Sequence, residues 1–139
     1  MNFWDSSAIA PLILEEKDTK KRESSLRQDS LVVVWYGTPA EIESAICRRV
    51  REGTLSPTQA GVARERASEF LASCAEVEPG PAVRERAMRL LRLHPLRAAD
   101  AFQLAAALIV CADRPSGVGF LTSDHRLGLA AELEGFQVQ

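Results

Sequence analysis

The chain has 139 residues, of which 46% are hydrophobic and 26% charged, and its 17 basic and 19 acidic residues give a net charge of −2. This length suits a single domain with one core, and the composition excludes a disordered, collagenous or coiled-coil protein. There is no apolar run of about 18 residues that would span a membrane and no basic N-terminal region typical of a secretory signal, and the net charge argues against coating nucleic acid by bulk positive charge.

The three cysteines, Cys47, Cys74 and Cys111, are scattered along the chain and form no CxxC pair. An odd number of dispersed cysteines disfavours both a disulfide framework and a cysteine zinc site. We therefore interpret them as small buried hydrophobic residues and predict a reducing, cytoplasmic environment.

The N-terminal third of the chain predicts a strand, a helix and a second strand. Residues 2–4 are a short apolar stretch, and residues 8–14 predict one or two turns of apolar helix. Residues 15–30 are mostly charged or polar and predict a surface helix or loop. Residues 31–35, with the sequence LVVVW, predict a strand that is buried on both faces, as in a parallel sheet.

Two helix-start signals follow this strand. Thr38-Pro39-Ala40-Glu41 places a capping residue first, a proline at the first helical position and a glutamate three residues after the cap, and Gly53 ends the predicted helix. Ser56-Pro57-Thr58-Gln59 repeats the pattern, and alanines at helical spacing continue it. The sequence therefore predicts two consecutive helices between residues 38 and 71.

The remaining elements again alternate between strands and helices. Residues 75–77 predict a short strand, Pro81 opens a helix, and residues 102–110 are apolar on nearly all sides, which indicates a buried helix. Residues 117–122 and 136–138 predict two more strands with a short helix between them. This alternation predicts one domain, residues 1–139, with a parallel sheet in a three-layer α/β/α arrangement.

Four acids stand where these strands end or helices begin. Asp5 follows the first strand, Asp124 follows a later strand, and Glu41 and Asp100 lie in first helical turns. Ligands of open parallel sheets bind at the carboxyl ends of the strands, so strand order can bring the four together. Clustered carboxylates repel one another unless a cation lies between them, and oxygen ligands without Cys or His favour Mg²⁺ or Mn²⁺. Such an ion activates water for phosphodiester hydrolysis.

Each acid also has a structural interpretation. Asp5 and Asp124 are suited to cap the helices that follow them, Glu41 fits a capping box, and Asp100 favours the positive end of its helix. The two roles do not exclude each other, because a helix N-terminus holds a carboxylate rigidly. Spacing alone leaves both interpretations open.

The segments around the four acids resemble the motifs of PIN domains, and of the VapC toxins in particular. The matching segments are residues 3–8 (FWDSSA), 35–45 (WYGTPAEIESA), 96–107 (LRAADAFQLAAA) and 120–127 (FLTSDHRL). They occur in the order found in the family and span essentially the whole chain, whereas residues 15–30 match no motif. Four acids in order with similar flanks make a specific resemblance, although each motif alone is weak.

This resemblance implies a PIN fold and a Mg²⁺- or Mn²⁺-dependent endoribonuclease that acts as the toxin of a type II toxin–antitoxin module. By position, Asp5, Glu41, Asp100 and Asp124 are the catalytic, metal-binding acids. Ser6 and Thr122 are the supporting hydroxyl residues. The implied partners are an RNA substrate, a second copy of the chain and a VapB-type antitoxin whose C-terminal tail covers the active site, with no membrane. Glu43 is a second candidate for the acid of this motif. Glu41 is favoured over it by the Glu-to-Ala spacing and because Glu41 lies nearer the end of the strand.

Several other residues are candidates for RNA contact. Residues 84–97 are locally basic, with only Glu85 opposing them, and residues 48–51 form a second basic cluster. Phosphate contact is the functional interpretation of such clusters and a solvated helix face is the structural one. The candidate residues are Arg97, Arg92 and Arg49.

Two other classes of function remain. One is a non-catalytic PIN-like module that binds RNA or a partner. The other is a receiver-type phosphorylation switch, which is disfavoured by the serines after Asp5 and by the confinement of lysine to residues 17–21.

Overall fold

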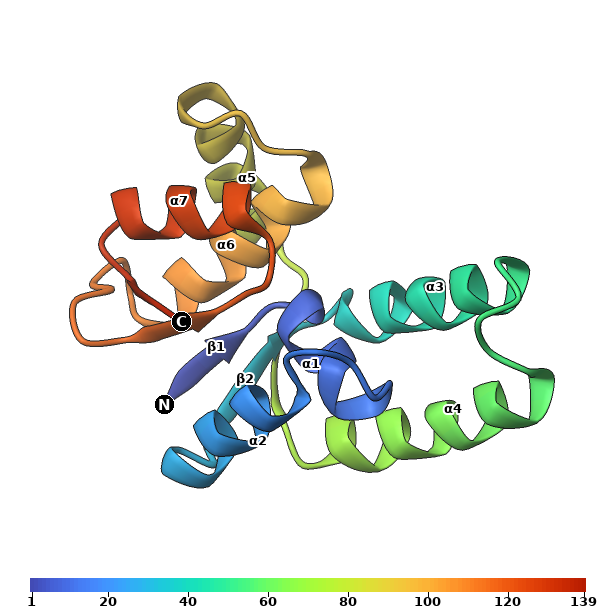
Figure 1. The fold of residues 1–139 in the computed structure, drawn as a ribbon. Coiled ribbons are helices and arrows are strands. Elements are labelled where there is room, and N and C mark those ends of the chain that lie inside the picture. The colour runs from blue at the N-terminus through green and yellow to red at the C-terminus, as the bar shows by residue number, and fades with distance from the viewer.

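The computed structural model describes all 139 residues and contains one five-stranded parallel sheet with helices on both faces (Figure 1). The strands lie in the order β3-β2-β1-β4-β5, and every pairing is parallel. Their bounds are β1 (Asn2–Trp4), β2 (Val32–Trp35), β3 (Ala75–Val77), β4 (Gly119–Leu121) and β5 (Gln137–Val138). The predicted three-layer α/β/α arrangement with a parallel sheet is confirmed.

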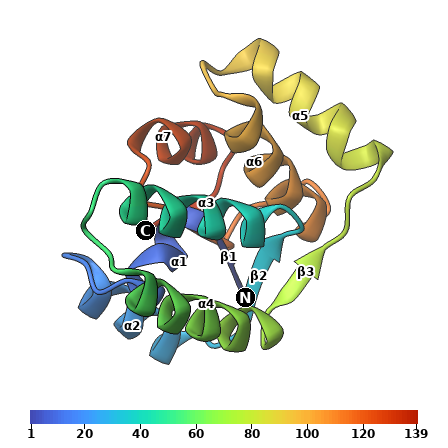
Figure 2. The same cartoon turned by 90° about the vertical axis from the view of Figure 1, so that its right-hand side faces the viewer.

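The helices form two layers that cover opposite faces of the sheet (Figure 1, Figure 2). One layer contains α1 (Ser6–Ile13), α2 (Thr19–Gln28), α3 (Thr38–Arg51) and α4 (Pro57–Ala72). The other contains α5 (Pro81–Leu93), α6 (Ala98–Val110) and α7 (His125–Leu133). Neighbouring side chains of a strand point to opposite faces, so Trp4 belongs to the first core and Phe3, stacked on Phe120, to the second. No helix is both long and apolar enough to cross a membrane.

The start of α4 matches its prediction, but the start of α3 does not. Ser56 and Gln59 form a reciprocal capping box with Pro57 in the first turn. At α3 the capping residue is Gly37 and makes no side-chain bond, while Thr38 is fully buried. A Cβ atom at Gly37 would lie 2.6 Å from Nε1 of Trp35, so glycine at this position leaves room for the indole. Glu41 is therefore not part of a capping box and is free to make other contacts.

Residues 15–30, predicted as a surface segment, are also partly buried. Its helix α2 carries two buried polar residues, Arg22 and Ser25, and only 1% of Arg22 is exposed. The interpretation of the cysteines needs a similar correction, because all three are free thiols that are only partly buried.

The strand order determines at which edge of the sheet a ligand is expected to bind. Starting from β1, the chain builds β2 and β3 on one side and β4 and β5 on the other. The reversal of strand order beside β1 is the switch point at which open parallel sheets bind ligands, at the carboxyl ends of the strands. This order also differs from the 2-1-3-4-5 order of receiver-type folds, which removes the phosphorylation switch as an alternative. In Figure 2 the viewer looks at the side of the molecule toward which β1 and β2 run in Figure 1.

Candidate active site

Asp5 lies at the carboxyl end of the central strand β1 and is 3% exposed. It is the N-cap of α1, where Oδ2 accepts a hydrogen bond from the backbone N–H of Ser7 at 3.2 Å. The same oxygen accepts hydrogen bonds from the hydroxyls of Ser7 and, at 3.0 Å, of Thr122. Its other oxygen, Oδ1, has only the hydroxyl of Ser6 at 3.4 Å. Helix capping therefore occupies one oxygen of Asp5 and leaves the other largely available.

Thr122 connects the ends of β1 and β4. While its hydroxyl donates to Asp5, it accepts a hydrogen bond from the backbone N–H of Asp124 at 3.0 Å. Asp124 is the N-cap of α7, and its Oδ1 accepts from the backbone N–H of Leu127 at 2.9 Å. Its Oδ2 has no donor in the protein, and the residue is exposed. The structure thus places Asp124 beside Asp5 through a buried threonine.

Ser6 connects Asp5 to Glu41 on α3. Its hydroxyl donates to Oε2 of Glu41 at 2.7 Å and lies 3.4 Å from Oδ1 of Asp5. The second oxygen of Glu41, Oε1, accepts from the side-chain amide of Gln103 on α6 at 3.1 Å. The predicted supporting hydroxyls, Ser6 and Thr122, therefore both contact predicted acids.

Gln103 and Asp100 lie one turn apart on the same face of α6. Gln103 is fully buried, and its amide also donates to the hydroxyl of Thr38 at 3.3 Å, while its Oε1 has no partner. Asp100 lies in the first turn of α6, where Oδ2 accepts from the backbone N–H of Arg97 at 3.4 Å. Its Oδ1 has no donor in the protein. One hydrogen-bonded chain thus runs from Asp124 through Thr122, Asp5, Ser6 and Glu41 to Gln103, and Asp100 stands beside its end.

Burial and mutual repulsion act together on three of the acids. Burial raises the pKa of Asp5, and the charge of Asp100 raises it further against the hydrogen bonds from Ser7 and Thr122. Burial likewise raises the pKa of Glu41, and the charges of Asp5 and Asp100 add to this. For Asp100, burial and the charge of Asp124 raise the pKa against the lowering effect of Arg97 and Arg126. The acids are therefore close enough to resist ionising together.

The donor chemistry of this site fits a hard divalent cation, although no three His, Cys, Asp or Glu side chains are gathered to hold one metal ion directly. Asp5, Asp100 and Asp124 each keep one carboxylate oxygen with little or no protein donor, and a cation would relieve their repulsion. Mg²⁺ keeps several waters and is bound through one or two carboxylates, so acids that are not in direct contact can share one hydrated ion.

Glu43 lies outside this group of acids. Its carboxylate pairs with Arg64 of α4 at 2.7 Å and accepts from the thiol of Cys47 at 3.1 Å. The hydrogen bond from Arg64 holds the pKa of Glu43 below its usual value, the reverse of the shift at Glu41.

Several basic side chains of residues 84–97 already pair with acids of the protein. Arg86 pairs with Asp113, and both Arg89 and His94 pair with Glu134. Glu85 is the only acid within residues 84–97, but acids from outside this segment also oppose the cluster. Of the candidate arginines, Arg97 affects the site, because its charge and its backbone N–H lower the pKa of Asp100. Arg92 instead donates to Met88 of its own helix at 3.2 Å, and Arg49 pairs with Glu16 at 3.2 Å.

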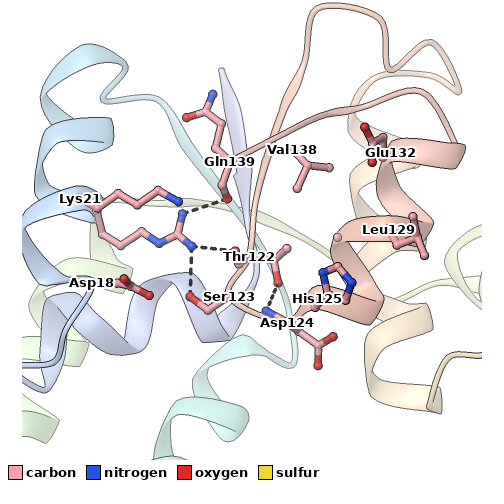
Figure 3. A pocket seen from close by; sticks show the side chains of 12 residues that line it. Asp18, Lys21, Thr122, Ser123, Asp124, His125, Leu129, Glu132, Val138 and Gln139 are labelled. Atoms are coloured by element: carbon pink, nitrogen blue, oxygen red, sulfur yellow. Dashed lines mark hydrogen bonds between the residues drawn. The ribbon is translucent and has the colours of Figure 1, made fainter.

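A pocket of about 370 Å³ lies beside the acids, between α2 and α7. Asp18 and Lys21 line it from α2, and Asp124 and His125 line it across from them (Figure 3). The buried guanidinium of Arg22 closes its floor by donating to the backbone oxygens of Thr122 at 2.7 Å and Gln139 at 3.1 Å. The sequence patterns did not single out Arg22, because nothing around it forms a motif.

A model of the PIN domain matches residues 3–133. The chain belongs to the PIN domain family. The resemblance noted in the four sequence motifs is confirmed, and all four motifs lie within the matched residues.

Relatives and solved structures agree with this assignment. The chain is 29% identical to Ribonuclease VapC45 and to Ribonuclease VapC49, from two strains of Mycobacterium tuberculosis, over 145 residues that cover 98% of this chain and 92% of each relative. Its fold is similar to that of PAE2754 from Pyrobaculum aerophilum, with a TM-score of 0.70 at 18% identity, covering 99% of this chain and 87% of the other. It is also similar to FitAcB from Neisseria gonorrhoeae, with a TM-score of 0.68 at 16% identity, covering 99% and 96%.

Gln103 of this PIN domain is a residue that the motifs contain but the sequence analysis did not single out. Replacing Gln103 by leucine keeps the side-chain size but removes the amide that donates to Glu41. Because that hydrogen bond lowers the pKa of Glu41, we expect Gln103→Leu to raise the pKa of Glu41 further. NMR titration of labelled glutamate carboxyls measures this shift, with Gln28→Leu on the exposed end of α2 as the control. An unchanged or lower pKa of Glu41 would contradict the role given to Gln103.

Proposed function

We propose that this PIN domain is a metal-dependent endoribonuclease that acts as the toxin of a type II toxin–antitoxin module. The observation that carries the proposal is the group of four acids at one edge of the sheet, three of which are connected by Ser6 and Thr122, with the pKa raised at Asp5, Glu41 and Asp100. Structural acids are normally paired with cations, as Glu43 is, and have lowered pKa values. Acids held together without a basic partner are typical of a site that binds a cation.

In this proposal Asp5, Glu41 and Asp100 hold one hydrated Mg²⁺ or Mn²⁺ between them, in part through its bound water, and Asp124 contacts it through water. Such an ion, when bound, lowers the pKa of water and neutralises charge on a phosphate. Ser6 and Thr122 keep the carboxylates of Glu41 and Asp5 oriented, and Gln103 holds Glu41 from the far side. Burial of Asp5 keeps its charge poorly screened, which strengthens its attraction for a cation.

The same proposal assigns the partners. The RNA substrate occupies the edge of the sheet above the acids, and a VapB-type antitoxin inhibits the protein by covering that edge. We also propose a homodimer, a toxin–antitoxin hetero-oligomer and a cytoplasmic location. The names of the two ribonuclease relatives support the toxin assignment. Growth arrest on expression, relieved by a small neighbouring gene, tests this part, and normal growth with soluble wild-type protein would contradict it.

RNA cleavage by the purified protein tests the enzymatic part. We expect cleavage of RNA with Mg²⁺ or Mn²⁺, none with EDTA, and a loss of about 100-fold or more in Asp100→Asn, because that change removes one of the charges that hold the ion. Asp113→Asn is the matched control, since Asp113 is exposed and pairs with Arg86 outside the site. Full activity of Asp100→Asn or in EDTA would contradict the proposal. Tight RNA binding without cleavage in any metal would instead favour a non-catalytic PIN-like module.

A further inference from the structure

A second cleft, of about 280 Å³, lies between α1 and α3. Ala10 and Ala45 line it, and the small size of these two side chains leaves the space open. Ser6, Ser7 and Ser123 line the end nearest the acids. Because Ser6 donates to Glu41 and Ser7 donates to Asp5, the cleft is directly connected to the predicted metal-binding carboxylates.

The far end of this α1–α3 cleft is positively charged. Arg48 and Arg49 line it, together with one acid, Glu16. Glu16 is already neutralised by Arg49, whose Nε also donates to the hydroxyl of Thr54 at 3.0 Å. Arg48 is exposed and makes no ion pair or side-chain hydrogen bond within the protein. The cleft therefore contains one arginine that forms no ion pair within the protein.

The position of Arg48 relative to the acids is fixed by the geometry of α3. Glu41, Ala45 and Arg48 follow one another at helical spacing and so share one face of α3. Seven residues of helix separate Glu41 from Arg48 by about 10 Å along the axis, and the long arginine side chain reaches back over part of that distance. This separation suits a group one step along a strand from the reacting phosphate rather than the reacting phosphate itself.

The hydroxyl of Ser123 adds one hydrogen-bond donor for an anion. The oxygen of Ser123 accepts from Arg22 at 3.1 Å, so its own hydroxyl hydrogen is free to point into the cleft. Arginine and serine side chains are common partners of RNA and DNA phosphates. A space of this volume accommodates a phosphate with its sugar but not a helix of a partner protein.

We propose that the α1–α3 cleft binds the phosphate next to the scissile phosphate on the RNA strand, with Arg48 as its principal contact. This inference rests on the proposed ribonuclease function. It replaces Arg49 by Arg48 as the RNA-binding residue of the basic cluster at residues 48–51, because Arg49 is paired within the protein. Arg48 contacts the substrate beyond the reacting atoms, so it sets substrate affinity and leaves the chemical step unchanged.

Cleavage kinetics of the Arg48→Ala variant on a short RNA test this inference. We expect KM to rise about tenfold with kcat within about twofold of wild type, and the slope of log(kcat/KM) against log salt to fall in magnitude by about one, because one charge-assisted phosphate contact is lost. Arg66→Ala is the control, since Arg66 is exposed on α4, has no acidic partner and lies outside the cleft. It removes the same charge and should change none of these values.

Substrates with one neutral methylphosphonate linkage identify the phosphate. In wild type, a neutral linkage at the position next to the cut should raise KM about as much as Arg48→Ala does, and in Arg48→Ala the same linkage should cause no further loss. If RNA is cleaved but Arg48→Ala behaves like Arg66→Ala, the cleft inference is wrong and the ribonuclease proposal stands. If Arg48→Ala cleaves normally but escapes inhibition by the antitoxin, the cleft binds a protein and the inference is equally wrong. If wild type cleaves no RNA, it is the ribonuclease proposal that fails.

Discussion

Replacing Asp5 by asparagine is expected to reduce RNA cleavage about 10²- to 10³-fold and, in the absence of divalent cations, to increase the stability of the folded protein at neutral pH. Losses of this size are measured when one preorganised electrostatic contact with a developing charge is removed. Asp5 is the most buried of the four acids and lies at the centre of the hydrogen-bonded chain between Asp124 and Glu41. Its charge is therefore the one that solvent screens least.

The increase in stability follows from the direction of the pKa shift. Burial raises the pKa of Asp5, so the folded protein holds this proton more tightly than the unfolded chain does. The unfolded state then binds fewer protons than the native state between the two pKa values, and the free energy of unfolding falls as the pH rises through that window. Asparagine is neutral at every pH. Its side-chain oxygen still accepts from Ser7 and Thr122, so the variant should keep the fold and lose only the charge.

Thermal unfolding in EDTA across pH 4 to 8 measures this effect, and RNA cleavage with Mg²⁺ measures the loss of activity. Glu43→Gln is a matched control with the opposite expectation, because the pKa of Glu43 is lowered by Arg64: it should not stabilise the protein at neutral pH and should cleave RNA normally. Added Mg²⁺ or Mn²⁺ should raise the Tm of wild type, as any ligand of the native state does, and raise that of Asp5→Asn much less. An Asp5→Asn protein that is less stable than wild type at pH 8 in EDTA would contradict this electrostatic account.

The acids could be found in the sequence because each depends on local signals. Asp5 and Asp124 follow short apolar strands and precede helices, and the structure confirms both as helix caps. Asp100 begins a helix that is apolar on nearly all sides. Strand ends and helix starts can be recognised within a few residues, and the parallel arrangement then brings such positions to one edge. The fold class was predictable for the same reason.

The contacts between distant segments could not be found in this way. Arg22 and Thr122 are separated by 100 residues, and Gln103 and Glu41 by 62, so no local pattern joins them. The partners of the basic region at residues 84–97 lie 27 to 45 residues further along the chain, which is why the cluster appeared unopposed. At α3 the capping pattern was present, but the cap lies one residue earlier, at Gly37, and Thr38 is buried within the fold. Tertiary packing therefore determines which of the local capping patterns in the sequence form in the structure.

Replacing Arg22 by alanine is expected to lower the free energy of unfolding by about 3 kcal/mol or more, because its two charge-assisted hydrogen bonds to carbonyl oxygens are lost at roughly 1.5–3 kcal/mol each. Arg22 is 1% exposed, and its guanidinium donates to the carbonyl oxygens of Thr122 and Gln139 and to the hydroxyl of Ser123, which lie around the same point in Figure 3. Without it, the carbonyl oxygens of Thr122 and Gln139 lose their side-chain donor and a cavity opens between α2 and the end of β4. A loss of this size corresponds to a fall in Tm of about 10 °C.

Two further variants separate the causes of this loss. Lys21→Ala, at the exposed neighbouring position of α2, should change the free energy of unfolding by less than about 0.5 kcal/mol. Arg22→Lys keeps the charge but lacks the planar fork that reaches two carbonyl oxygens at once, so its stability should be closer to that of Arg22→Ala than to that of wild type. Urea unfolding of the three variants gives the free energies of unfolding, and an Arg22→Lys protein as stable as wild type would show that charge alone holds α2 in place.

Arg22 also holds two groups on which the proposed RNA site depends, because Thr122 donates to Asp5 and Ser123 lines the α1–α3 cleft. Arg22→Ala should therefore weaken RNA cleavage even at temperatures where the variant remains folded.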